Sequence, residues 1–353
     1  MQDKKRVILG MSGGVDSSVA AALLKEQGYE VIAVFMKNWS EDDGECTAKE
    51  DYMDVVSVCS KLDIKHYTVN FEKEYRDEVF SYFLSEYKKG RTPNPDVMCN
   101  TEIKFKAFLN YALDFDADYI AMGHYARTRK IDGKTHLLRG VDGNKDQSYF
   151  LSRVPNEALE RCLFPVGDLE KDQVRSIAKK YDLSTASKKD STGICFIGER
   201  DFNEFLDRFL FTKPGPIQDT EGHILGEHSG LIHYTIGQRR GIGIGGVGSG
   251  EPFFVADKDL ENNTLIVAQG VKHPALYRHS FYGEDPFWIV EEPTFPLECT
   301  IKIRYRTPDV KATVIKDSKG LFIRPEKALK GVTPGQVVVF YDGEICLGSA
   351  IIK

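Results

Sequence analysis

A glycine-rich loop between a short apolar run and a helical segment is the sequence feature that most constrains the fold. Arg6–Leu9 predicts a buried strand, Ser12–Ser18 reads SGGVDSS, and Val15–Gln27 predicts a helix closed by Gly28. Paired glycines let the backbone approach an anion, and the helix directs free N–H groups and its positive dipole end at that anion. The loop lacks the lysine of a Walker A motif. It therefore predicts a different kind of phosphate site, in which Asp16 can help to hold a Mg²⁺ ion.

Strand-like and helix-like segments alternate through the first half of the chain. We expect further strands at Glu30–Phe35, Lys65–Asn70 and Tyr119–Met122. The helical segments are expected at residues 51–62, 71–89, 102–113, 171–181 and 201–211. This alternation predicts an α/β fold, a doubly wound parallel sheet with helices on both faces.

The composition of the sequence changes near Pro214, after which glycine and proline separate short β-rich runs. These runs predict strands at residues 231–234, 252–256, 265–268, 300–305, 312–315, 321–323 and 336–341. Short strands at such spacing are typical of small β-barrels and sandwiches. We therefore expect three domains at residues 1–210, 211–273 and 274–353, the last a β-barrel.

The net charge of −6, from 47 basic and 53 acidic residues, argues mildly against nucleic acid as a partner. That total averages over residues 301–330, which carry nine basic and three acidic side chains. Arg239 and Arg240 form a second cationic spot. Local positive surface suffices to bind phosphates, so the sequence keeps RNA as a candidate partner.

The chain contains seven cysteines, at positions 46, 59, 99, 162, 195, 299 and 346. An odd number with no CxxC pair excludes a secreted disulfide framework. The sequence shows neither an apolar run of membrane-spanning length nor a secretory signal. We therefore expect a cytoplasmic protein with no membrane partner.

Two of the cysteines have unusual surroundings. Cys99 closes the run PNPDVMC, just before a helix that we expect to begin near Thr101, and a helix N-terminus favours the thiolate. Asp96, three residues upstream, can accept or donate a proton. Cys195 lies in a loop that passes from polar to apolar residues between glycines. We interpret the other five cysteines as packing residues.

Three further motifs are long enough to indicate a family: GHYAR at 123–127, KDQSYFL at 145–151 and YTIGQRRG at 234–241. With the loop and the two cysteines, they closely resemble the bacterial tRNA-specific 2-thiouridylases (the MnmA/TrmU family). That family belongs to the PP-loop ATP pyrophosphatases, whose catalytic domain is adenine nucleotide alpha hydrolase-like. The resemblance runs from Arg6 to Gly348, nearly the whole chain.

The resemblance implies that sulfur replaces the C2 oxygen of the wobble uridine in tRNA anticodons. ATP, with Mg²⁺, would first adenylate that oxygen, and sulfur transfer would then give 2-thiouridine and AMP in addition to the pyrophosphate already released. The residues that match the family's ATP site are Gly10, Met11, Ser12, Gly13, Gly14, Val15, Asp16, Ser17, Met36 and Gly123. The residues that match its tRNA contacts are Asn94, Pro95, Asp96, His124, Lys145, Asp146, Gln147, Arg304, Tyr305 and Gln336.

In the implied mechanism Cys195 carries a persulfide received from a sulfur donor protein, Cys99 is the nucleophile and Asp96 handles a proton. Cys99 either releases sulfide from the persulfide, leaving a Cys99–Cys195 disulfide, or the persulfide attacks carbon 2 directly. The sequence does not separate these routes. Either route needs a reductant to restore the thiols.

Two other functions are compatible with parts of the sequence. A PP-loop amidotransferase or synthetase acting on a small molecule would have the loop, but it would need neither two reactive cysteines nor a basic barrel. An RNA-binding module with a degenerate nucleotide site is disfavoured by the intact loop. His223, His228 and His233 resemble a metal cluster, but steps of five residues alternate between the faces of a strand, so we expect no metal site there.

Overall fold

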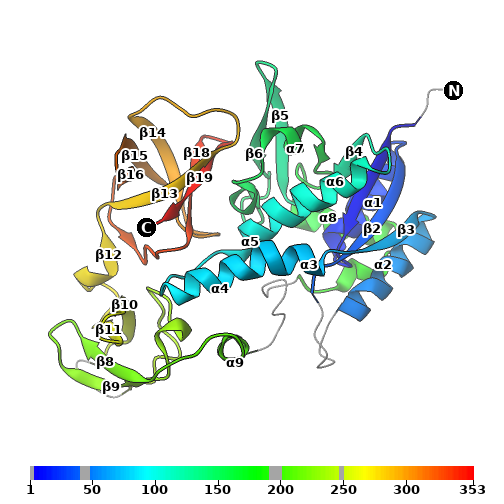
Figure 1. The fold of residues 1–353 in the computed structure, drawn as a ribbon. Helices are drawn as coiled ribbons and strands as arrows, with labels where there is room; N and C mark the ends of the chain where they lie inside the picture. The colour runs from blue at the N-terminus through cyan, green and yellow to red at the C-terminus, as the bar shows by residue number, and fades with distance from the viewer. Residues whose placement is uncertain (1–3, 40–47, 191–200, 246–249) are drawn as a thin grey trace.

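The computed structural model describes residues 4–39, 48–190, 201–245 and 250–353. The first part of the chain forms a five-stranded parallel sheet, seen at the right of Figure 1, in the order β3-β2-β1-β4-β7. Its strands are β1 (Arg6–Met11), β2 (Glu30–Lys37), β3 (Lys65–Asn70), β4 (Tyr119–Ala121) and β7 (Cys162–Leu163). The predicted doubly wound α/β sheet is confirmed.

Alternate residues of β1 face two separate cores, because successive strand side chains point to opposite sides of a sheet. Val7 and Leu9 pack with helices on one face, whereas Ile8 packs with helices on the other. The first face is covered by α1 (Val15–Glu26), α2 (Ala48–Leu62) and α8 (Lys171–Lys180).

The second face is covered by two long helical runs (Figure 1). The first comprises α3 (Glu72–Glu74), a π-helical segment η1 (Tyr75–Phe80) and α4 (Ser81–Lys88). The second comprises α5 (Pro95–Met98), a π-helical segment η2 (Cys99–Ala107) and α6 (Phe108–Leu113). Shorter helices elsewhere are η3 (Ser148–Leu151), α7 (Asn156–Glu160), η4 (Ser184–Ser187), α9 (Phe202–Asp207) and η6 (Pro274–Leu276). No helix in the described ranges is long and apolar enough to cross a membrane.

A four-stranded sheet follows, in the order β10-β11-β8-β9. Its strands are β8 (Gly215–Asp219), β9 (Ile224–His228), β10 (Phe253–Asp259) and β11 (Thr264–Gln269). The strand predicted at residues 231–234 is wrong, since Leu231–His233 forms a 3₁₀ turn, η5. That turn still buries Leu231 against Ile217 and Val267. A short apolar run reports burial, and it does not distinguish a strand from a helical turn.

The C-terminal part is a closed, six-stranded antiparallel barrel, which confirms the predicted barrel. Its strands are β13 (Phe281–Trp288), β14 (Leu297–Lys302), β15 (Val310–Asp317), β16 (Gly320–Pro325), β18 (Val337–Asp342) and β19 (Ile345–Ile352), and β13 pairs with β19 to close it. The short strands β12 (Tyr277–Arg278) and β17 (Leu329–Lys330) pair beside it.

A hairpin from the first half of the chain extends the sheet of this barrel. It consists of β5 (Ala126–Ile131) and β6 (Lys134–Arg139), joined by a tight turn. Leu137 and Leu138 of β6 pair with Cys346 and Ile345 of β19. Backbone hydrogen bonds therefore join the barrel to a hairpin that follows β4 of the parallel sheet in the chain.

Candidate active site

The glycine-rich loop lies at the carboxyl end of the central strand β1, and its shape depends on close backbone packing. Gly13 has a φ of +75°, and a Cβ there would lie 2.4 Å from the backbone oxygen of Asp51. A Cβ on Gly10 would lie 2.9 Å from atoms of both Met36 and Met122. Neither position can take a larger residue without a shift of its neighbours.

The serines of the loop shape the start of α1. The Ser12 and Ser17 hydroxyls lie 3.3 Å apart, and Ser17 and Ser18 donate to the carbonyl oxygen of Gly14 at 3.1 and 2.8 Å. Gly14 is the N-cap residue, and it provides no side-chain cap for the first turn. The uncapped N-terminus of a helix after a glycine pair fits a phosphate group.

Two lysines from distant parts of the chain bring positive charge to this loop. The Lys171 ammonium lies 2.7 and 2.9 Å from the carboxylate oxygens of Asp16, and the Tyr125 hydroxyl donates to the same carboxylate at 2.7 Å. The Lys188 ammonium donates to the carbonyl oxygen of Gly13 at 3.1 Å. It also pairs with Asp51, 2.6 Å away. Sequence reasoning missed both lysines, because neither stands in a phosphate-binding motif.

Asp190 connects the loop to the predicted tRNA-contact motif at Lys145. Its carboxylate lies 2.6 Å from the Lys145 ammonium, 2.8 Å from Lys171 and 3.0 Å from Arg175. Burial alone would raise the pKa of Asp190, but hydrogen bonds from Lys145 and Lys171 prevail and lower it to about 2. Asp190 directly precedes residues 191–200, so the predicted persulfide carrier Cys195 lies outside the described residues.

The other predicted ATP residues gather at the same edge of the sheet. Met36 lies near the carboxyl end of β2 and contacts the Gly10 position of β1. Gly123 follows β4, and a Cβ there would lie 2.7 Å from the backbone nitrogen of Ser17. The strands β2 and β4 flank β1, and ligands of open α/β sheets bind where the loops after such strands diverge.

The helix that carries Cys99 begins earlier than the sequence suggested. Asn94 is its N-cap, with Oδ1 accepting from the Val97 N–H at 3.2 Å, and Pro95 is its first residue. The prediction that a helix begins near Thr101 is therefore wrong, because Asn-Pro is itself a helix-start signal. Cys99 lies inside the helical run, and its side chain is only 2% exposed.

Asp96 and His124 face a common neighbour that the sequence did not reveal, Lys104. Burial raises the pKa of the Asp96 carboxyl, and the charge of Lys104 opposes that rise. The Lys104 ammonium lies 3.5 Å from His124 Nε2. Burial, assisted by Lys104, holds the pKa of His124 well below its ordinary value, so its imidazole is neutral. His124 follows Gly123, so this cluster connects the cysteine helix to the glycine-rich loop.

Two other predicted tRNA contacts hold turns of the catalytic part. Asp146 accepts from the backbone N–H groups of Gly140 and Ser148 at 3.1 and 3.0 Å. Gln147 Oε1 accepts from the Tyr125 N–H at 2.9 Å. Their side chains therefore have structural partners in the absence of RNA.

The three predicted contacts in the C-terminal part join segments to one another. Arg304 Nη2 donates to the carbonyl oxygens of Ile236 and Gly331 at 2.7 and 3.0 Å. The Tyr305 hydroxyl donates to the carbonyl oxygen of Lys145 at 3.3 Å. Gln336 Nε2 donates to the carbonyl oxygens of Thr92 and Pro93 at 2.9 and 3.1 Å. These three side chains therefore join the C-terminal part to the central part, to the turn at Lys145 and to the segment before the cysteine helix.

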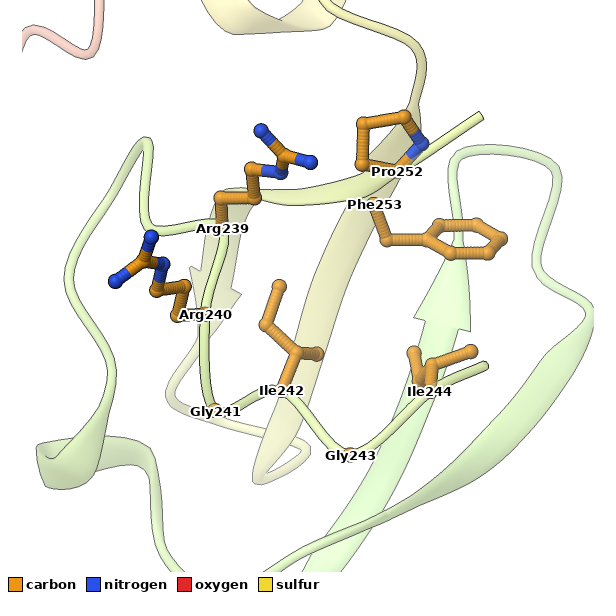
Figure 2. A pocket seen from close by; sticks show the side chains of 8 residues that line it. All are labelled: Arg239, Arg240, Gly241, Ile242, Gly243, Ile244, Pro252 and Phe253. Atoms are coloured by element: carbon orange, nitrogen blue, oxygen red, sulfur yellow. The ribbon is translucent and has the colours of Figure 1, made fainter. Parts of the chain in front are cut away.

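A pocket of about 280 Å³ lies in the central sheet region, next to the second cationic spot. Figure 2 shows Arg239 and Arg240 along one wall, with Ile244 and Phe253 on the opposite side. Both arginine side chains are exposed. Guanidinium groups beside an apolar floor suit an RNA phosphate and its neighbouring base.

Within the described part of the chain, no group of three or more His, Cys, Asp or Glu side chains could hold a metal ion. The histidines considered from the sequence have separate partners. His223 pairs with Asp219 at 2.9 Å, and His233 pairs with Asp207 at 2.8 Å.

This arrangement, an open parallel sheet with an SGGxDS loop at its carboxyl edge and a cysteine helix packed on one face, defines a protein of the PP-loop fold. Three family models match the chain in succession: the tRNA methyl transferase HUP domain at residues 5–199, the tRNA methyl transferase PRC-barrel domain at 203–269 and the aminomethyltransferase beta-barrel domain at 278–352. Despite these model names, the full-length relatives are thiouridylases. The chain belongs to the tRNA-specific 2-thiouridylase family, MnmA.

The relatives match over nearly their whole length. The tRNA-specific 2-thiouridylase MnmA 1 of Geobacillus kaustophilus is 60% identical over 355 residues, covering 99% of this chain and 95% of that protein. MnmA of Proteus mirabilis is 57% identical over 357 residues, covering 99% of this chain and 97% of that protein. A solved 4-thiouridine synthetase–RNA complex with bound ATP has a TM-score of 0.38 at 18% identity, over 58% of this chain and 50% of that one, and no argument rests on it.

The family, the fold class and the enzyme class predicted from the motifs are thereby confirmed. Membership in this enzyme family sets aside the non-enzyme RNA-binding module. It also disfavours a synthetase acting on a small molecule, since the matching relatives are named as tRNA-specific.

Proposed function

We propose that this protein replaces the C2 oxygen of the wobble uridine of tRNA with sulfur, converting ATP to AMP and pyrophosphate. The observation that carries the proposal is that the phosphate loop and the cysteine helix meet at the segment after β4. The phosphate loop contacts Gly123, and the next residue, His124, contacts the helix that bears Asp96 and Cys99. A base held between them would meet both ATP and the sulfur chemistry.

In the first step the C2 oxygen of uracil bonds to the α-phosphorus of ATP, and pyrophosphate leaves. The loop residues Gly10–Ser17 hold the phosphates, and Lys171 and Lys188 offset their charge. Asp96 accepts the proton that N3 of uracil loses, because burial raises the pKa of this carboxyl and so makes its carboxylate a stronger base.

A Mg²⁺ ion bound with the nucleotide would supply further charge neutralisation. Asp16 is the loop carboxylate available to it, and in this structure that carboxylate accepts from Lys171 and Tyr125. Because the described residues hold no cluster of three metal-ligating side chains, most ligands of the ion would come from the phosphates and water.

In the second step sulfur bonds to carbon 2, the C2–O bond breaks, and AMP leaves with the oxygen. Cys195 holds the sulfur as a persulfide supplied by a donor protein. Cys99 bonds to the Cys195 sulfur as the terminal sulfur departs, so that a Cys99–Cys195 disulfide forms. A thiol reductant then returns two electrons and two protons to the pair.

The tRNA partner fits the distribution of charge and the nature of the target. A wobble base already lies in a loop, so extruding it into the site costs less than opening a base pair. Arg239 and Arg240 contribute exposed charge near the central pocket, and the basic strands of the barrel contribute more. We also propose that the protein acts in the cytoplasm.

The test is direct. The protein is incubated with ATP, Mg²⁺, a sulfide source and unmodified tRNA, and nucleosides are analysed by mass spectrometry for 2-thiouridine. Cys99→Ser should abolish the product, whereas Cys299→Ser, at a partly exposed barrel position, should retain it. Absence of 2-thiouridine with the unaltered protein would refute the proposal. Thiol mapping after oxidation should recover a Cys99–Cys195 bridge.

A further inference from the structure

Three polar side chains line one face of the helix that carries Cys99, although its surroundings are packed apolar residues. Asp96, Asn100 and Lys104 are spaced four residues apart, so they lie on the same side of the helix. Asn100 is 3% exposed, and its Nδ2 donates to the Asp96 carbonyl oxygen at 2.9 Å. Within the described part of the chain, its Oδ1 is buried without a hydrogen-bond partner. A buried amide oxygen of this kind costs free energy unless a ligand donates a hydrogen bond to it.

Lys104 differs from the other lysine of this helical segment. Lys106 pairs with Glu102 at 2.5 Å, as exposed helix lysines commonly do. Among the described residues, no carboxylate forms an ion pair with Lys104, and its hydrogen-bonding neighbour is His124 Nε2 at 3.5 Å. Within the described ranges the half-buried ammonium therefore has no carboxylate at hydrogen-bonding distance, and the charge of Asp96, on the same face of the helix, acts on it at longer range.

A half-buried cation with no carboxylate in hydrogen-bonding contact favours the arrival of an anion. The position of Lys104 indicates which anion. His124 follows Gly123, whose backbone packs against Ser17 of the phosphate loop, and Cys99 is on the helix of Lys104 itself. The ammonium therefore lies where the helix that carries Cys99 meets the segment after β4 that packs against the phosphate loop.

We propose that Lys104 is a further catalytic residue, whose ammonium binds a non-bridging oxygen of the phosphate that becomes AMP. This inference rests on the proposed function. The ammonium stays protonated throughout: it holds the α-phosphate while pyrophosphate leaves, and it stabilises the negative charge on AMP while the C2–O bond breaks. A donor aimed at developing charge in a site of this kind contributes about 100-fold to the rate.

The competing explanation is that Lys104 merely supports the packing of the helix against His124. Comparing AMP with adenosine separates the two, because the ligands differ only in the phosphate. Lys104→Met should weaken the binding of AMP about tenfold, measured by calorimetry, and leave adenosine binding unchanged. Lys104→Arg should retain the preference for AMP, and Lys106→Met is the matched control on the same helical segment.

The same variants are then assayed for 2-thiouridine formation at saturating ATP and tRNA. Lys104→Met should lower the rate about 100-fold with little change in tRNA affinity, and Lys106→Met should behave as the unaltered protein. Equal weakening of AMP and adenosine, or an unchanged rate, would overturn the role of Lys104. If the methionine variant does not fold, Lys104→Gln takes its place. Failure of the unaltered protein to thiolate tRNA would instead refute the proposed function, and the two failures are distinguishable.

Discussion

The side-chain amide of Gln336, in the barrel part of the chain, lies 2.9 Å from the carbonyl oxygen of Thr92, to which it donates a hydrogen bond. The Thr92 N–H in turn donates to the carbonyl oxygen of Pro334 at 2.9 Å. Two residues later, Asn94 caps the helix that carries Cys99. The barrel therefore fixes the place where the catalytic helix begins.

Gln336→Ala removes the donor shared by two backbone carbonyls and should loosen the start of this helix. We expect the turnover number for tRNA thiolation to fall about tenfold, because small displacements of a reacting group are costly. The affinity for tRNA should change less. Steady-state kinetics and filter binding measure the two quantities, with Gln27→Ala, an exposed position at the end of α1, as the control. A loss confined to tRNA affinity would show that Gln336 is an RNA contact only.

The negative charge of the buried Asp96 carboxylate should lower the free energy of unfolding at neutral pH. Burial raises the pKa of this carboxyl above its ordinary value of 3.8, and Lys104 opposes the rise. The folded protein therefore binds the proton more tightly than the unfolded chain does. Its free energy of unfolding falls as the pH rises from 3.8 through the pKa of the folded state.

Asp96→Asn removes that destabilisation, so the variant should unfold at a higher temperature than the unaltered protein at pH 7. The difference should narrow as the pH falls towards 3.8. Thiolation should fall at least about 100-fold, since the proton acceptor is lost. Thermal unfolding over a pH series measures the first effect, with the exposed Asp114→Asn as control. A variant less stable than the unaltered protein at pH 7 would contradict the assignment.

Local patterns in the sequence predicted much of the fold. The strand expected at Lys65–Asn70 has those bounds in the structure, and the SGGVDSS loop joins a strand to a helix as expected. These features depend on residues close together in the chain, so their spacing carries the information. The start of the Cys99 helix is also signalled locally, by Asn94-Pro95.

Contacts between distant residues were beyond such reasoning. Lys171 pairs with Asp16 across 155 positions, and Gln336 bonds to Thr92 across 244. From sequence alone, a lysine in a helix is expected to be exposed to solvent, because its partners from distant segments are known only from the fold. Lys104 was closer to detection, because the four-residue spacing from Asp96 and Asn100 places it on their face of the helix.

Lys171 should contribute to the binding of ATP rather than to the binding of tRNA. Its side chain is only 12% exposed, and its ammonium lies between the carboxylates of Asp16 and Asp190. Lys171→Met leaves those two negative charges beside the phosphate loop, where they would repel a triphosphate. The KM for ATP should rise at least about tenfold with little change in the KM for tRNA. Lys180→Met, at the exposed end of the same helix, is the control, and a selective loss for tRNA would be the opposite result.

The arginines of the central pocket should determine part of the salt dependence of tRNA binding. Each phosphate contact adds about one to the slope of log association constant against log salt concentration. Replacing Arg239 and Arg240 together by alanine should therefore make the slope shallower by about two and weaken binding at low salt. Lys61→Ala removes an exposed lysine that pairs with Asp182 in the part of the chain that contains the parallel sheet, and it should leave the slope unchanged. Filter binding over a salt series measures both, and equal slopes for the two variants would exclude this pocket from the RNA surface.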